Sequence, residues 1–224
     1  MPSARIHEVI ARRINQDYNM DDTLLRLGTI SPDSWRNSGA KDKYLSHFWN
    51  FDIKEGEAND YERFYIKYHD DINNPFYFGY LLHLMVDQYW KSIVNKNYFV
   101  NINGVSNCIL KDGSLKEDKE HFSYYESLKI QKRLFKDFNL TILPTNIEDV
   151  PNLECNIEEL DLSGLFGPNG SINYINTKVV PNGEDEELLL YDYNDILKYI
   201  DETTEFVKSE LNRLSQLEIR KETR

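Results

Sequence analysis

The sequence is organised around one apolar run, PFYFGYLLHLMVDQYW, which extends from Pro75 to Trp90. Apolar side chains occupy nearly every position, so the run predicts a helix that is buried on all sides. Pro75 suits the first turn of that helix, where its missing N–H costs nothing. His83 and Asp87 are four residues apart and therefore share one helix face. This ionisable pair requires compensation in an apolar helix, either by a divalent cation or by a simple His–Asp hydrogen bond.

The N-terminal segment, residues 3–16, has the second clear helical pattern. Isoleucines recur every four residues from Ile6 to Ile14, and this spacing matches one face of a helix. Ser3 precedes the pattern as a suitable N-cap. His7 lies beside the isoleucine stripe, so we expect its side chain to point inward.

The remaining pattern predicts an all-α fold in a single domain of residues 1–224. Further helical segments are expected at residues 24–27, 42–51, 59–70, 115–138 and 191–214. Gly28 is expected to end the helix before it, and Asp33 lies on a rigid Pro-Asp turn. Residues 95–114 look like an irregular connection. Residues 140–190 look like a loop or insertion, with a small hairpin as one alternative.

The composition excludes several classes of partner. A net charge of −12 without a basic cluster opposes binding to duplex nucleic acid. No apolar run approaches the roughly 20 residues that span a bilayer, and the first residues form no hydrophobic signal region. We therefore expect a cytoplasmic protein without stable membrane insertion. Cys108 and Cys155 are far apart and lack CxxC spacing, which predicts free thiols. The oligomeric state stays open.

Histidines and acidic residues supply a candidate set of metal ligands: His7, Asp33, His47, His83 and Asp87. This mixture of nitrogen and hard oxygen donors suits zinc, and it also accommodates iron or manganese. Three or four protein ligands leave one position for water, and the metal lowers the pKa of that water until hydroxide forms near neutral pH. The set therefore predicts a hydrolase that uses a metal-bound hydroxide.

Four stretches of the chain resemble the bacterial zinc-dependent phospholipase C family, whose wider fold relatives include fungal single-strand nucleases. The stretches are Met1-Pro2-Ser3 with His7, the "G-x-x-x-P-D" turn from Gly28 to Asp33, Ser46-His47-Phe48, and Phe78 to Asp87, in the order that the family shows. They cover roughly the first 95 residues. The resemblance implies a multi-helix fold of the phospholipase C and nuclease type, with phosphate esters or diesters as small phosphorylated substrates.

The resemblance also implies how the metals are shared. Asp33, His47, His83 and Asp87 would form a first zinc site, and His7 would join Asp87 at a second one. The family holds a further zinc with two histidines and a glutamate. This chain has Asn95 and Asn97 where the first of those histidines is expected, and His121 and Glu126 have a spacing that does not suit one helix face. We therefore expect one or two zinc ions.

Other residues are candidates for the cleft. Asp33 is expected to ligate a metal or to accept a proton during hydrolysis. Trp35, Trp49 and Tyr65 are candidates to line the cleft, with packing between helices as the alternative for each.

Two other functions compete with this interpretation. An HD-domain phosphohydrolase would use His47, the adjacent pair His69-Asp70, and Asp87, but it would leave His7 without a role. A non-catalytic helical scaffold with a structural metal site would instead surround the ion with four protein ligands and no open position.

Overall fold

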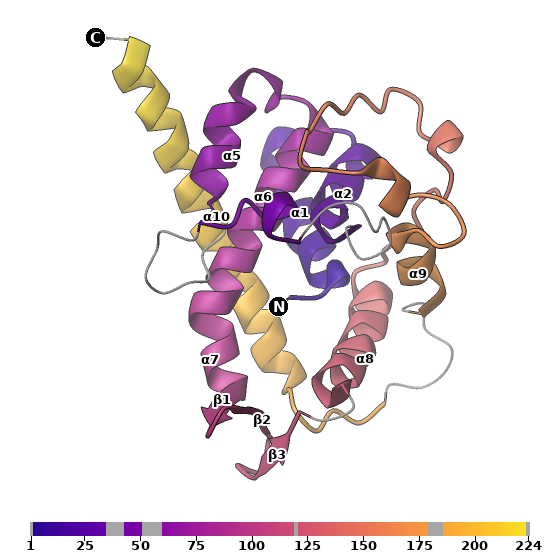
Figure 1. Cartoon of the computed structure of the whole chain (residues 1–224), viewed down its shortest axis with the longest axis vertical. Helices are drawn as coiled ribbons and strands as arrows, with labels where there is room; N and C mark the ends of the chain where they lie inside the picture. The colour runs from indigo at the N-terminus through magenta and orange to yellow at the C-terminus, as the bar shows by residue number, and fades with distance from the viewer. Residues whose placement is uncertain (1, 35–42, 51–59, 119–120, 179–185, 223–224) are drawn as a thin grey trace.

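The computed structural model describes residues 2–34, 43–50, 60–118, 121–178 and 186–222, and it is mostly helical with one small sheet (Figure 1). Its principal helices are α1 (Ala4–Tyr18), α2 (Asp22–Ile30), α4 (Lys43–Ser46), α5 (Tyr61–Lys67), α6 (Pro75–Tyr89), α7 (Asn95–Tyr98), α8 (Phe122–Asp137), α9 (Ser171–Lys178) and α10 (Tyr193–Glu222). The strands are β1 (Phe99–Ile102), β2 (Val105–Ile109) and β3 (Leu115–Glu117). Short 3₁₀ turns cover Ser31–Ser34, His69–Asp71, Ile147–Asp149 and Leu162–Gly164.

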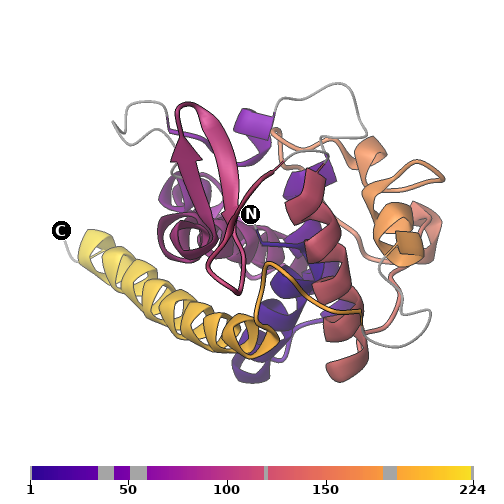
Figure 2. The same ribbon diagram turned by 90° about the horizontal axis from the view of Figure 1, so that it is seen from below.

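Helix α6 forms the centre of the fold, as its sequence predicts. Every residue from Phe76 to Asp87 is buried, because α1, α2, α5 and α10 pack around it. The helix begins with Pro75 in its first turn, and the side chain of Asn74 accepts a hydrogen bond of 2.9 Å from the backbone N–H of Phe76. In both views α8 and α9 lie on one side of α1, and α10 lies on the other (Figures 1 and 2).

Two glycines allow α2 and α6 to approach closely. A Cβ atom on Gly28 would lie 2.1 Å from the carbonyl oxygen of Phe76, and one on Gly79 would lie 2.1 Å from that of Leu25. Our expectation that Gly28 ends α2 was wrong, because the helix continues through it to Ile30. Gly28 serves helix packing here and not helix termination.

A buried charge cluster fixes α1 against α2. Glu8 accepts two hydrogen bonds from Arg5, at 2.9 and 2.8 Å, and one of 3.0 Å from Arg26. Arg26 also donates to the hydroxyl of Thr141 at 2.9 Å. All three charged residues are buried, so the loss of one partner would leave a buried charge uncompensated. The cluster thereby fixes the position of α1, the helix that carries His7, relative to α2.

The expectation that residues 95–114 form an irregular connection was wrong. This segment forms α7 and then the first two strands of the antiparallel sheet β1-β2-β3. Asn103 and Gly104 connect β1 to β2 with φ angles of 52° and 83°. Both residues tolerate positive φ, and such a pair favours a tight hairpin over an irregular loop.

The expectations for the C-terminal half need further corrections. Residues 115–138 are not one helix, because β3 occupies their start and α8 begins only at Phe122. Residues 140–178 are largely irregular, as expected, but α9 stands where a hairpin was the alternative. Residues 179–185 lie outside the described part. The last helix is confirmed, although α10 extends beyond the predicted end at residue 214.

As expected, neither cysteine forms a disulfide; Cys108 is buried and Cys155 is half-buried. Among the described residues, no helix combines the length and the apolar character needed to cross a bilayer.

Candidate metal centre

The structure brings all five candidate ligands together from four parts of the chain. His7 comes from α1, Asp33 from the turn after α2, His47 from the turn after α4, and His83 and Asp87 from α6. They form two overlapping groups, one of His7, His83 and Asp87 and one of Asp33, His47 and His83. Within each group the potential ligand atoms lie within 4.8 Å of one another. Asp33 is the most accessible of the five, with 29% of its side chain exposed.

Backbone carbonyls set the orientation of two histidines. His83 Nδ1 lies 2.7 Å from the carbonyl oxygen of Thr29, and His47 Nδ1 lies 3.0 Å from that of Lys43. A carbonyl oxygen only accepts hydrogen bonds, so each Nδ1 carries the proton. Each ring is therefore left with a lone pair on Nε2. In many metal sites a histidine likewise donates one ring N–H to a backbone carbonyl and binds the metal through its other ring nitrogen.

The two lone pairs face each other. His83 Nε2 and His47 Nε2 are 3.3 Å apart. Without a proton or cation between them, two such nitrogens repel. Two nitrogens bound to one tetrahedral zinc at about 2.0–2.1 Å are separated by about 3.3–3.4 Å. The observed distance therefore fits a shared cation of this type.

Asp87 presents its two oxygens to different partners. Oδ1 lies 3.6 Å from His7 Nε2, and Oδ2 lies 3.8 Å from His47 Nε2. Burial by itself would raise the pKa of Asp87, but His7, His83, Lys91 and His47 outweigh it and hold that pKa well below its usual range. An ionised carboxylate in this position suits a bridge between two cations.

His7 completes the cluster, and outside the cluster it has no polar partner among the described residues. Its ring stacks on that of His83, with centroids 4.0 Å apart and planes 7° apart. Neither ring nitrogen forms a hydrogen bond with a described residue, although only 2% of His7 is exposed. Burial and the neighbouring His7 lower the pKa of His83 to about 3, so its ring is neutral and able to ligate. The donor set therefore fits a second cation between His7 and Asp87.

Lys91 belongs to this centre, and our sequence reasoning missed it. Its Nζ lies 3.4 Å from Asp87 Oδ2 and 4.5 Å from the centre of the Trp49 ring, and 10% of its side chain is exposed. It lies on a π-helical turn, Trp90–Val94, directly after α6. The signal was present, because residues four apart on a helix are neighbours. Lys91 thus competes with any cation for Asp87.

We expect Lys91→Met to strengthen zinc binding by about tenfold or more, because it removes a positive charge from beside the cation. The metal-free protein should become less stable, since Asp87 loses a buried partner. Competition with a chelating dye measures the first effect and urea unfolding the second. Lys91→Arg keeps the charge and serves as the control. Weaker zinc binding in Lys91→Met would contradict this role.

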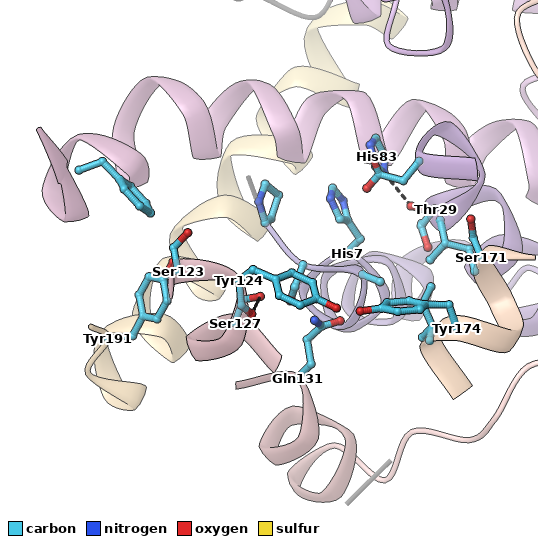
Figure 3. Close-up of a pocket in the computed structure, with 17 residues that line it drawn as sticks. His7, Thr29, His83, Ser123, Tyr124, Ser127, Gln131, Ser171, Tyr174 and Tyr191 are labelled. Atoms are coloured by element: carbon cyan, nitrogen blue, oxygen red, sulfur yellow. Dashed lines mark hydrogen bonds between the residues drawn. The ribbon is translucent and has the colours of Figure 1, made fainter. Parts of the chain in front are cut away.

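A cavity of about 510 Å³ opens beside the centre. Asp33 contributes to its wall. His7 and His83 also belong to the wall (Figure 3). The rest of the wall comes from Pro2, Ser3, Ala4, Thr29, Ile30, Phe99, Ser123, Tyr124, Ser127, Gln131, Ser171, Tyr174, Ile175 and Tyr191.

The aromatic residues of this wall differ from those that we expected. Trp49 and Tyr65 do not line the cavity: Trp49 stacks beside Lys91, and Tyr65 packs on the core and on the His69 ring. Trp35 lies outside the described residues. The wall instead contains tyrosines from α8, α9 and the segment before α10. No periodicity links these segments to α6, so the sequence contained no local signal for them.

The remaining histidines lie elsewhere. His69 is exposed beside Asp70, at 3.2 Å, and belongs to neither ligand group. His121 is exposed before α8. Glu126 accepts hydrogen bonds from the backbone N–H groups of Leu189 and Leu190, at 2.6 and 2.8 Å. Within the described parts of the chain, the ligand groups provide no third metal site.

Comparison with known proteins gave no match to a family model, to a curated protein or to a solved structure.

Proposed function

We propose that this protein is a metal-dependent hydrolase of phosphate esters or diesters, with zinc as the preferred metal. The observation that carries the proposal is the pair of opposed Nε2 atoms of His47 and His83, 3.3 Å apart with both Nδ1 atoms committed to carbonyls. This pair lies beside two carboxylates and a buried histidine without a hydrogen bond. The sequence resemblance to the phospholipase C family adds phosphate esters as the substrate class.

Each residue has a defined task in this proposal. Asp33, His47 and His83 would hold one ion, and His7 and Asp87 would hold a second, with Asp87 reaching both. A bound zinc ion supplies an acidified water and polarises a phosphoryl oxygen. Asp33 is partly exposed at the cavity, so it is placed to accept the proton of the water that attacks phosphorus. The ester P–O bond then breaks, and the leaving oxygen takes up a proton.

The geometry favours this function over the two alternatives. A structural metal site is closed by its protein ligands, whereas three of these five residues line a cavity. The HD arrangement needs His69 and Asp70 at the metal, but both lie at the surface and outside the ligand groups.

Zinc content and hydrolysis, measured on one preparation, test the proposal. We expect zinc-loaded protein to hydrolyse bis(4-nitrophenyl) phosphate or 4-nitrophenyl phosphate, and chelation should abolish the activity. Asp33→Asn should retain zinc at His47 and His83 but lose about 10²-fold or more in rate. Stoichiometric zinc without hydrolysis, and without an exchangeable water on the metal, would indicate the structural scaffold.

We expect two zinc ions per chain, of unequal affinity. The ion beside His7 has fewer protein ligands, so it should leave first on chelation. His7→Ala should reduce the bound zinc from two equivalents to one, as measured by elemental analysis after gel filtration. His69→Ala is the control and should retain both ions and the activity. A metal-depleted His69→Ala protein together with an unaffected His7→Ala protein would restore the HD interpretation.

A further inference from the structure

The wall of the cavity contains polar groups that form no hydrogen bond with the described residues. Gln131 of α8 is 7% exposed, and its amide forms no hydrogen bond with a described residue. The hydroxyl of Ser3 is buried and also lacks a partner. Ser3 occupies the N-cap position of α1, as the sequence predicts, yet its side chain makes no capping bond. Buried polar groups are normally satisfied, so the Ser3 hydroxyl indicates a missing ligand, and the Gln131 amide is available to the same ligand in the cavity wall.

Two other hydroxyls of the wall have already donated their protons to the protein. Ser123 donates to Asp118 Oδ2, and Ser127 donates to the carbonyl oxygen of Tyr124. Each oxygen is left with lone pairs only, so it acts as an acceptor towards the cavity. A ligand that satisfies them must bring hydrogen-bond donors.

The wall is also uncharged away from the metal centre. Of its 17 described residues, none is a lysine or an arginine, and Asp33 of the centre is its one carboxylate. Tyr124 and Tyr174 reach toward each other from α8 and α9, with Gln131 below them and His7 above (Figure 3). Aromatic rings pack against apolar faces, while the amide of Gln131 offers both donors and an acceptor.

We propose that the cavity binds a neutral polyol, such as a sugar or inositol ring, that is esterified to the phosphate cleaved at the centre. This inference rests on the proposed function for the phosphate, but the polyol site itself depends only on the cavity. A polyol supplies donors for the hydroxyl oxygens of Ser123 and Ser127, and its C–H faces suit the tyrosines. Quaternary ammonium groups have no donors, and a second phosphate would meet no cation among the described residues of the wall. The volume is within the range of about 300–1,000 Å³ that small-ligand sites occupy.

Calorimetry on the zinc-loaded protein compares myo-inositol 1-phosphate with isobutyl phosphate, phosphocholine and pyrophosphate. We expect the inositol ester to bind about tenfold or more tightly than each of the others, because a site built for hydroxyls rejects analogues that lack them. Gln131→Leu should remove most of this preference. It should leave the zinc content unchanged. Gln16→Leu, on the exposed face of α1, is the matched control.

The variant Gln131→Glu distinguishes a neutral polyol from a cationic ligand. A neutral polyol should lose affinity to this variant, whereas a cationic ligand would gain it. Tightest binding of phosphocholine, strengthened by Gln131→Glu, would therefore overturn the proposal, and so would equal binding of all four compounds. Free myo-inositol, observed by ligand-detected NMR on the metal-free protein, tests the cavity without the metal. Its binding, and the loss of that binding in Gln131→Leu, would support the polyol site even if no phosphate ester were hydrolysed.

Discussion

Replacing Asp87 with alanine is expected to abolish zinc binding and hydrolysis together. The two oxygens of this carboxylate face His7 and His47 from opposite sides, so both proposed ions depend on it. The variant also leaves Lys91 without its buried partner, and the charge of Lys91 then repels any remaining cation. We expect residual zinc below one equivalent and a loss of activity of about 10³-fold or more.

Thermal unfolding provides an independent readout. An ion that binds the native state at 1,000 times its Kd stabilises that state by about 4 kcal/mol, so zinc should raise the Tm of the wild type clearly above its value in chelator. The Tm of Asp87→Ala and of His83→Ala should not respond to zinc. The Tm of each variant with zinc is compared with the Tm of the same variant in chelator, so a change in metal-free stability does not affect the result. Asp70→Ala, at an exposed position, should respond as the wild type does. Equal responses in all four proteins would disprove the centre.

Much of this centre was predictable because its residues lie on regular helices. The spacing of His83 and Asp87 defines a shared face without any tertiary information, and the isoleucine stripe of α1 directs His7 inward in the same way. His47 and Asp33 are different, because no periodicity joins them to α6. Their inclusion depended on the resemblance and on residue type, and the structure brings them within reach of His83.

The cavity was not predictable, because it exists only between segments that are distant in the chain. Gln131 looks like an ordinary helical residue of α8, and only its place in the cavity wall of the folded protein distinguishes it. Ser3 illustrates the same limit. A serine before a helix predicts an N-cap, but here the position is right and the capping bond is absent. Sequence patterns predict which position of a helix a residue occupies. The groups that its side chain contacts depend instead on how distant segments pack.

Gly28 and Gly79 show how a local rule fails when packing overrides it. Glycine in a helix interior costs about 0.5–1 kcal/mol relative to alanine, so local propensity favours helix termination or replacement at both positions. The structure keeps both glycines inside helices, because α2 and α6 meet backbone to backbone there. This close approach also brings the carbonyl of Thr29 within 2.7 Å of His83 Nδ1.

Gly79→Ala is therefore expected to destabilise the protein by about 3 kcal/mol or more, against the gain of about 1 kcal/mol that helix propensity alone predicts. The new Cβ would lie 2.1 Å from the carbonyl oxygen of Leu25 and 3.0 Å from the backbone nitrogen of Thr29. Neither is a flexible side-chain atom, so α2 and α6 must separate. Urea unfolding of the metal-free protein measures the effect. Gly113→Ala is the control, since nothing lies within 4 Å of its Cβ and only its positive φ of 80° is strained.

The same substitution should weaken the metal centre. When the two helices separate, the hydrogen bond from His83 Nδ1 to Thr29 is lost, and the Nε2 lone pair is no longer held toward His47. Loss of such an outer partner costs about 10- to 100-fold in metal affinity, although Gly79 contacts no metal ligand atom. Gly113→Ala should bind zinc as the wild type does. A Gly79→Ala protein that is more stable than the wild type and binds zinc normally would show that this helix contact does not position the site.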